Sequence, residues 1–326
     1  MKPLFYVSVG LSSGITLYIV TPIYIILKNN LSIDSPNKPL PYYMLFPYDH
    51  QIPAYYYPTF AWCVYLGYMA ILQSCAMDVL FSHFVSFTCG QFELLHGRIV
   101  RLIPDCHEEW RKSYGNKCNT MDYKTSLEQL QMIYNTRLHQ ISVDHSELLR
   151  YCVDLENLYA FPLMANMLVS SLIISFGGFQ LIISGQNSIV NFVRFLLYLV
   201  SVSIQLYAVC YLGTSLISLS TKTAHYLSMC NWEGGFISRN SPLIDESDVM
   251  EAHCLNQKQP LWKHIDYPSS DVNFRRKLSF MILRSNRPAK LTAMKFAEIS
   301  LETFNQILST SVSFFAVLKT FMDRIA

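Results

Sequence analysis

The sequence predicts an all-α, polytopic membrane protein, in which a bundle of helices crosses the bilayer. Hydrophobic residues make up 51% of the 326 residues and charged residues only 15%, whereas a soluble domain carries about 25% charged residues. The mean hydropathy is +0.23. The few charges are also unevenly placed, because long stretches of the chain contain none. This composition excludes intrinsic disorder, collagen and coiled coils.

Stretches without Asp, Glu, Lys or Arg mark the expected membrane helices. About 20 apolar residues are needed to cross the ~30 Å hydrocarbon core. The helices of a soluble core are the alternative, but they rarely reach 18 residues without a charge. The charge-free stretches are Pro3–Leu27, His50–Met77, Asn157–Val193, Phe195–Thr221 and Thr303–Leu318. With a turn expected at 184–188, they predict five spans in one domain (1–326), at about 4–27, 56–92, 153–183, 190–222 and 294–322.

The basic residues of the connections predict the orientation of these spans. Eight Lys and Arg lie in the connection 93–152 and eleven in the connection 222–295, but only two lie in 28–55. Cytoplasmic loops carry an excess of Lys and Arg. We therefore expect both basic connections in the cytoplasm, the N-terminus inside and the C-terminus outside.

Both cytoplasmic connections are expected to contain helix. Apolar residues at near-helical spacing between Leu127 and Ile141 indicate that the flanking membrane helices continue beyond the bilayer. Phe274–Arg287 is basic and partly apolar, and Pro288 follows it. It is expected to form a cytoplasmic helix before the last span.

Three polar or small features lie within the spans. Asp78 near the cytoplasmic end of the second span is expected to form a structural ion pair, because an unpaired carboxylate in a membrane is costly. Gly177 and Gly178 indicate a close approach of two helices. The last span mixes Asn305, Gln306 and several Ser and Thr residues with large apolar ones. Such a face either packs against other helices or lines water, and the residues alone do not decide between these.

The sequence does not suggest an enzyme, a cofactor, a metal site or a nucleic-acid-binding protein. No HExxH or Walker motif occurs, and no pair of carboxylates lies in apolar surroundings. The spacing of the Cys and His residues does not fit a zinc site. The net charge is only +2, and no basic run is present that would follow a phosphate backbone.

The C-terminal part carries a long and specific pattern. Leu278–Pro288 contains R-S-x-R-P, Leu291–Phe296 reads L-T-A-x-K-F, and Ser300–Phe304 reads S-L-x-x-F. In this combination the sequence resembles the insect odorant receptors. Cys75–Val79 and the segment from Tyr226 to Trp232 are also similar to that family, and the resemblance covers essentially the whole chain.

The resemblance implies a seven-helix fold in which the five expected spans correspond to helices 3 to 7. The N-terminal helices of that fold are expected to be missing from this sequence. The family resemblance also implies an odorant-binding subunit of a ligand-gated, non-selective cation channel in the plasma membrane of the olfactory sensory neuron dendrite. Such subunits form heterotetramers with an odorant co-receptor through anchor regions, here about 93–152 and 223–293. Their ligands are small, volatile and hydrophobic, and helix 7 lines the pore.

The resemblance also implies candidate site residues. Ordinary packing is the alternative for each pocket residue, and lipid contact is the alternative for each pore residue. The expected pocket residues are Leu11, Gly14, Tyr18, Tyr65, Met69, Phe195 and Tyr198, and the expected pore constriction lies at Val317 and Phe321.

Three other classes of membrane protein make different predictions. A G-protein-coupled receptor would have a cytoplasmic C-terminus, against the charge bias of the loops. A gustatory-type chemoreceptor would carry a Thr-Tyr…Gln-Phe type of motif in its last helix, which is not found here. A transporter would show internal repeats, and none is visible.

Overall fold

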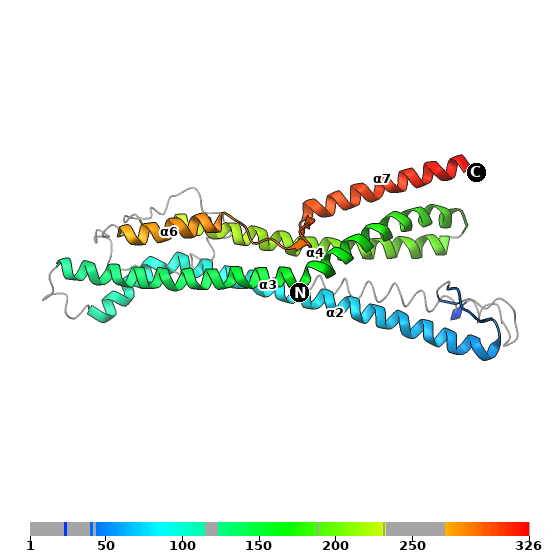
Figure 1. Cartoon of the computed structure of the whole chain (residues 1–326), viewed down its shortest axis with the longest axis horizontal. Helices are drawn as coiled ribbons and strands as arrows, with labels where there is room; N and C mark the ends of the chain where they lie inside the picture. Colours follow the sequence, from blue (N-terminus) through cyan, green and yellow to red (C-terminus); the bar gives the residue numbers. More distant parts are fainter. Residues whose placement is uncertain are drawn as a thin grey trace. The chain divides into compact units, whose positions relative to one another are not determined.

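A computed structural model shows an all-α chain built on three long helices. It describes residues 23–24, 40–41, 44–114, 123–187, 189–230, 232 and 271–325. The long helices are α2 (Pro53–Tyr114), α3 (Tyr123–Asn187) and α4 (Ile189–Met229) (Figure 1). The predicted span 4–27 lies almost entirely outside the described residues.

Only a part of each long helix can lie in the bilayer. The 62 residues of α2 and the 65 residues of α3 extend for about 95 Å at 1.5 Å per residue, about three times the hydrocarbon thickness. Within the described part of the chain, α2, α3 and α4 are the three helices that are long and apolar enough to cross a membrane. The predicted extension of membrane helices through the connection 93–152 is confirmed, since α2 continues to Tyr114 and α3 starts at Tyr123.

The described chain forms two compact units, and each long helix contributes to both. The first unit comprises the described residues within Met1–Cys89, Cys152–Ile217 and Lys290–Ala326. The second unit comprises those within Gly90–Tyr151 and Ser218–Ala289. Most of the charge-free sequence falls in the first unit, so we place the membrane there.

The second unit has a continuous apolar core. It includes the short helix α6 (Val272–Ser285), which buries Phe274, Leu278 and Met281. This helix matches the one expected at 274–287. The other core residues come from α2, α3 and the end of α4, and among them are Ile99, Leu102, Leu138, Ile141 and Leu227.

A small hairpin and one further helix complete the first unit. The hairpin joins β1 (Thr292–Ala293) to β2 (Ala297–Glu298) in antiparallel register. The helix α7 (Leu301–Ile325) follows it and has 25 residues, or about 37 Å. This length is sufficient for a span, although α7 is not one of the three apolar helices above.

Two predicted boundaries were wrong. The last helix begins at Leu301 instead of 294, because Met294 and Lys295 have positive φ angles of 50° and 63° that close the hairpin. The turn expected at 184–188 is also wrong for residues 184–187, because these residues are the end of α3, which continues to Asn187. Gly185 does not end α3, because a helix tolerates a glycine at a modest cost.

Candidate functional site

One face of α7 packs against α3 and α4 within the first unit. The Ser311 side chain is 1% exposed, and its hydroxyl donates to the Ser171 carbonyl of α3 at 3.4 Å. The ring of Phe304 meets Tyr207 of α4 edge-on, with 5.5 Å between centroids. Phe315 lies beside Gly178, where an added Cβ would sit 3.6 Å from its ring. At 100° per residue, the three packed residues of α7 fall within about 40° of one another.

The opposite face of α7 is exposed and polar. It extends along the whole helix, from its first turn to its last. At 100° per residue its polar members fall within about 60° of one another. These exposed residues are Glu302, Gln306, Ser309, Ser313, Thr320 and Arg324. We call them the polar face of α7.

The hydroxyls of the polar face are only partly satisfied by the helix itself. Ser313 donates to the carbonyl of Ser309 at 3.0 Å, and Thr320 donates to that of Ala316 at 2.9 Å. These bonds use the hydroxyl hydrogens and leave the oxygen lone pairs open to another donor. Hydrocarbon offers no such donor, so a membrane-length helix with this face favours a water-filled surrounding.

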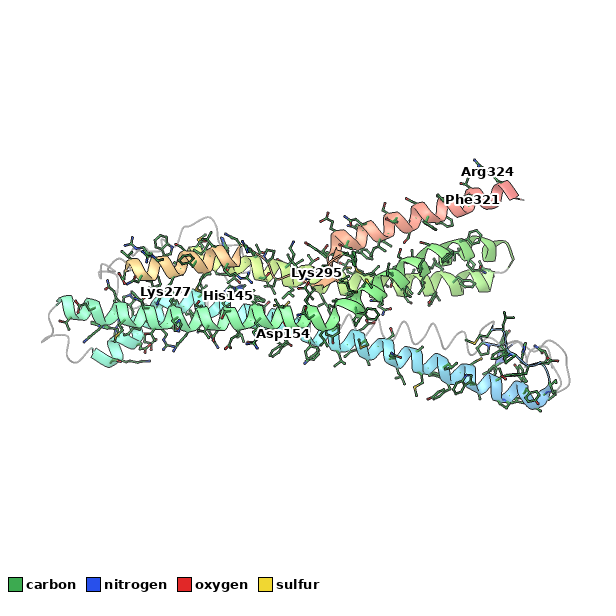
Figure 2. All side chains as sticks on the ribbon, viewed as in Figure 1. His145, Asp154, Lys277, Lys295, Phe321 and Arg324 are labelled. Carbon is green, nitrogen blue, oxygen red and sulfur yellow. The ribbon has the colours of Figure 1, made fainter. Side chains whose placement is uncertain are left out.

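Val317 and Phe321 lie beside the polar face. Their side chains are 53% and 62% exposed, and Phe321 sits near the C-terminal end of α7 (Figure 2). They are one helical turn apart, at the end of α7 that we expect to lie outside the cell. Their position next to exposed hydroxyls suits a narrow apolar zone in an otherwise polar path.

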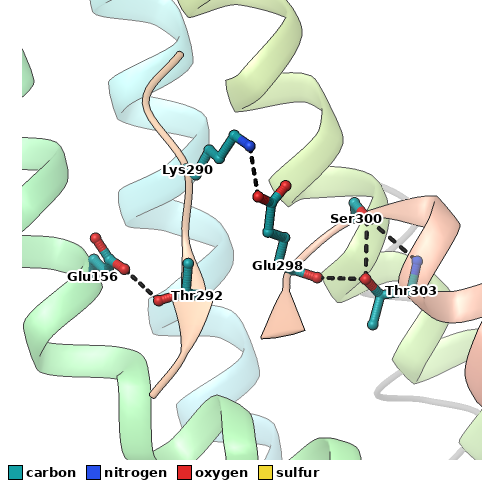
Figure 3. A network of polar contacts seen from close by, with 6 residues as sticks. All are labelled: Glu156, Lys290, Thr292, Glu298, Ser300 and Thr303. Carbon is teal, nitrogen blue, oxygen red and sulfur yellow. Dashed lines mark hydrogen bonds and ion pairs between the residues drawn. The ribbon is translucent and has the colours of Figure 1, made fainter. Parts of the chain in front are cut away.

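Polar contacts hold the hairpin and the start of α7 (Figure 3). The Thr292 hydroxyl of β1 donates to the Glu156 carboxylate of α3. Lys290 and Glu298 form an ion pair at 2.5 Å. The Thr303 hydroxyl donates to the Glu298 carbonyl at 2.7 Å, while the Thr303 amide donates to the Ser300 hydroxyl at 3.3 Å. Ser300 thus acts as the N-cap of α7.

A cavity of about 470 Å³ lies between α3, α4 and α7 of the first unit. Its wall is apolar apart from a few hydroxyls, among them those of Ser203 and Ser311. Four residues of α7 contribute to the wall: Phe304, Ser311, Val312 and Phe315. A cavity of this size and lining suits a small hydrophobic molecule.

The expected pocket residues are only partly described. Leu11, Gly14 and Tyr18 lie outside the described residues. Tyr65 and Met69 lie one turn apart on α2, and their side chains are 50% and 45% exposed. Two further members, Phe195 and Tyr198, are half-buried on the first turns of α4. These assignments stay predictions.

Asp78 and the glycine pair Gly177–Gly178, which lie within the expected spans, both contact α4. The carboxylate of Asp78 on α2 accepts a hydrogen bond from the Gln205 amide on α4. The partner is therefore a neutral amide instead of the expected cation. The predicted close approach at the glycine pair is confirmed, because a Cβ at Gly177 would lie 2.5 Å from Leu199 of α4.

The contacts of α7 with Ser171 and Tyr207 were not expected from the sequence. Small residues on α3 could have indicated a close contact with another helix, and Ser171 and Gly178 are two such residues. Within the described ranges, no three His, Cys, Asp or Glu side chains gather in a way that would hold a metal ion.

The helices described here define a multi-pass membrane protein, and comparison with known proteins gives its family. The sequence model described as 7tm Odorant receptor matches residues 1–241 and 254–312. The chain therefore belongs to the odorant receptor family.

Individual relatives agree with this assignment. The chain is 34% identical over 308 residues to odorant receptor 13a of Drosophila melanogaster, a match that covers 94% of this chain and 63% of that protein. It is 25% identical over 290 residues to odorant receptor 85b of the same species, covering 89% of this chain and 59% of that protein. The chain thus spans less than two thirds of the length of these relatives.

The fold is similar to that of a solved receptor. The olfactory receptor OR5 from Machilis hrabei in complex with eugenol has a TM-score of 0.67 at 12% sequence identity. The similarity covers 98% of this chain and 66% of that one. It shows that the two chains share a helical fold.

Proposed function

We propose that the chain is the odorant-binding subunit of a ligand-gated, non-selective cation channel, and that α7 lines its pore. The observation that carries this proposal is the polar face of α7, which is exposed along a helix of membrane length. Burying that face in hydrocarbon would leave the Gln306 amide and the open lone pairs of the hydroxyls without partners, at a cost of several kcal/mol. Copies of α7 from neighbouring subunits, arranged around water, avoid this cost.

Membership of the family supports the proposed partners and orientation. The other subunits of the proposed heterotetramer are odorant co-receptors, and the second unit is the region that anchors them to this chain. The channel lies in the plasma membrane of the olfactory sensory neuron dendrite, with the N-terminus cytoplasmic and the C-terminus extracellular. Lys and Arg in the two long connections support this orientation.

The proposed ligand is a small, volatile, hydrophobic molecule. The expected pocket comprises Leu11, Gly14 and Tyr18 together with residues of α2 and α4. The exposed side chains of Tyr65 and Met69 on α2 support it, since they are available to a ligand. Ligand burial would favour the open state of the channel to the extent that the open state binds the ligand more tightly.

Cysteine accessibility tests the position of α7 directly. Ser309→Cys and Ser313→Cys place thiols on the polar face, and Ser311→Cys places one on the packed face as a matched control. Each variant is expressed with a co-receptor and treated with a membrane-impermeant, charged methanethiosulfonate during odorant application. The unsubstituted receptor controls for its native cysteines.

The expected result is a change of the odorant-evoked current in the Ser309 and Ser313 variants, with no change in the Ser311 variant. Equal reactivity of all three thiols, or protection of both thiols on the polar face, would contradict the proposal.

A further inference from the structure

The first backbone N–H of α7 is bound by a side chain of another helix. The first N–H groups of a helix have no partner within it. The Leu301 N–H donates to the Thr214 hydroxyl oxygen of α4 at 2.9 Å. The same hydroxyl donates its hydrogen to the Cys210 carbonyl at 3.1 Å. The Thr214 hydroxyl thus joins the backbone of α4 to the first residue of α7.

The neighbouring residue of α4 allows an unusually close backbone approach. An added Cβ at Gly213 would collide with the Ile299 carbonyl oxygen and lie 2.9 Å from the Ile299 carbonyl carbon. Ile299 is fully buried, and its N–H donates to the Leu291 carbonyl at 2.9 Å. This backbone is therefore not free to move away from α4, and only glycine fits at position 213.

The same segment is tied to α3. The Thr292 hydroxyl, at the start of the hairpin, donates to Glu156. The hairpin pairs Thr292 with Glu298, directly before Ile299. A displacement of α4 at its contact with Ile299 and Leu301 therefore acts on the start of α7. The hairpin before α7 is meanwhile held by its contact with α3.

We propose that Gly213 and Thr214 are positioning residues that transmit the movement of α4 to the pore helix. This inference rests on the proposed function of α7. Tyr198, an expected pocket residue, lies 16 residues before Thr214 on the same continuous helix, or about 24 Å away. A ligand that shifts this helix would shift the bond between Thr214 and Leu301 with it.

The test removes the acceptor and the donor of this bond separately. Thr214→Val keeps the shape of the side chain and deletes the hydroxyl, whereas Thr214→Ser restores the hydroxyl. Leu301→Pro removes the N–H donor without changing α4, and proline is tolerated at the first position of a helix. Each receptor is expressed with a co-receptor, and odorant dose–response curves, reversal potential and surface density are measured.

Loss of one hydrogen bond is expected to raise the half-maximal odorant concentration ~2- to 10-fold in Thr214→Val and in Leu301→Pro. The reversal potential and surface density should not change, and Thr214→Ser should respond as the unchanged receptor does. A merely structural role would lower surface density and leave the sensitivity of the remaining channels unchanged.

Four outcomes would overturn this inference. They are a normal dose–response curve in Thr214→Val, a normal curve in Leu301→Pro, a Thr214→Ser variant as impaired as Thr214→Val, or loss of surface delivery in both bond-deleting variants. The cysteine experiment separates this result from the proposed function. Reactive thiols at 309 and 313 with a normal Thr214→Val curve would leave the pore assignment intact and reject only the positioning role.

Discussion

The Gln205 side chain of α4 donates a hydrogen bond to the Asp78 carboxylate of α2, and it also reaches the Ser74 hydroxyl at 3.4 Å. These residues are 127 positions apart in the chain. Their contact joins α2 to α4 inside the first unit. It also gives a polar partner to a carboxylate that would otherwise face apolar surroundings.

Gln205→Leu is expected to destabilise the receptor by about 1–3 kcal/mol, because it leaves the Asp78 carboxylate without its amide partner. The double variant Asp78→Leu/Gln205→Leu removes both polar groups and should recover part of this loss. The melting temperature of the detergent-solubilised receptor measures the effect. If the double variant melts at a lower temperature than Gln205→Leu alone, the two side chains do not act as a pair.

Two buried histidines of the second unit predict a loss of stability in acid. Burial, together with the positive charges of Lys222 and His145, lowers the pKa of His96 to about 4. Burial and the charge of Arg284 lower the pKa of His145 to about 4. The ordinary value is 6.5, so the unfolded chain binds more protons than the folded one between pH 6.5 and 4. Stability therefore falls as the pH falls through this window.

The melting temperature should drop on the order of 5 °C between pH 7.5 and pH 5. His145→Gln should reduce this drop, because one of the buried titrating groups is gone. His139→Gln on the same helix is the matched control, since His139 is exposed. If the melting temperature of His145→Gln falls in acid as much as that of His139→Gln, or more, the buried His145 is not a source of the acid sensitivity.

Two glycines of long helices should respond in opposite ways to alanine. Gly213→Ala introduces a methyl group against the buried Ile299 backbone and should cost 2 kcal/mol or more, roughly the effect of overpacking a core. Gly97→Ala on α2 has no neighbouring atom within 4 Å of the new methyl group and should be neutral or stabilise by about 1 kcal/mol. Thermal stability and surface density of the two variants give the comparison, and equal behaviour would argue against the close contact.

The membrane helices were predictable because their signal is local. The absence of charge between Asn157 and Val193, for example, is enough to predict a span. The short helix α6 was also predictable, from its apolar spacing and from Pro288 after it. Both predictions depend on neighbouring residues alone.

The hairpin and the docking of α7 were not predictable in this way. Met294 and Lys295 adopt positive φ without being glycine, and neither residue type signals such a turn. Thr214 and Leu301 are 87 positions apart, and their contact depends on how α4 and α7 pack. The polar residues of α7 were visible in the sequence, but only the structure separates the packed Ser311 from the exposed Ser309 and Ser313.

In the proposed channel, the exposed side of α7 borders the ion path, and the path is narrowest at Val317 and Phe321. Single-channel recording of Val317→Ala and Phe321→Ala, with sodium and a larger organic cation as charge carriers, tests this placement. Val312→Ala is the matched control for conductance and permeability, because Val312 lies on the opposite side of the helix, where it lines the cavity between α3, α4 and α7. We predict a higher conductance and a higher relative permeability of the organic cation in the first two variants only. Unchanged conductance and permeability in both, at normal surface density, would contradict this placement.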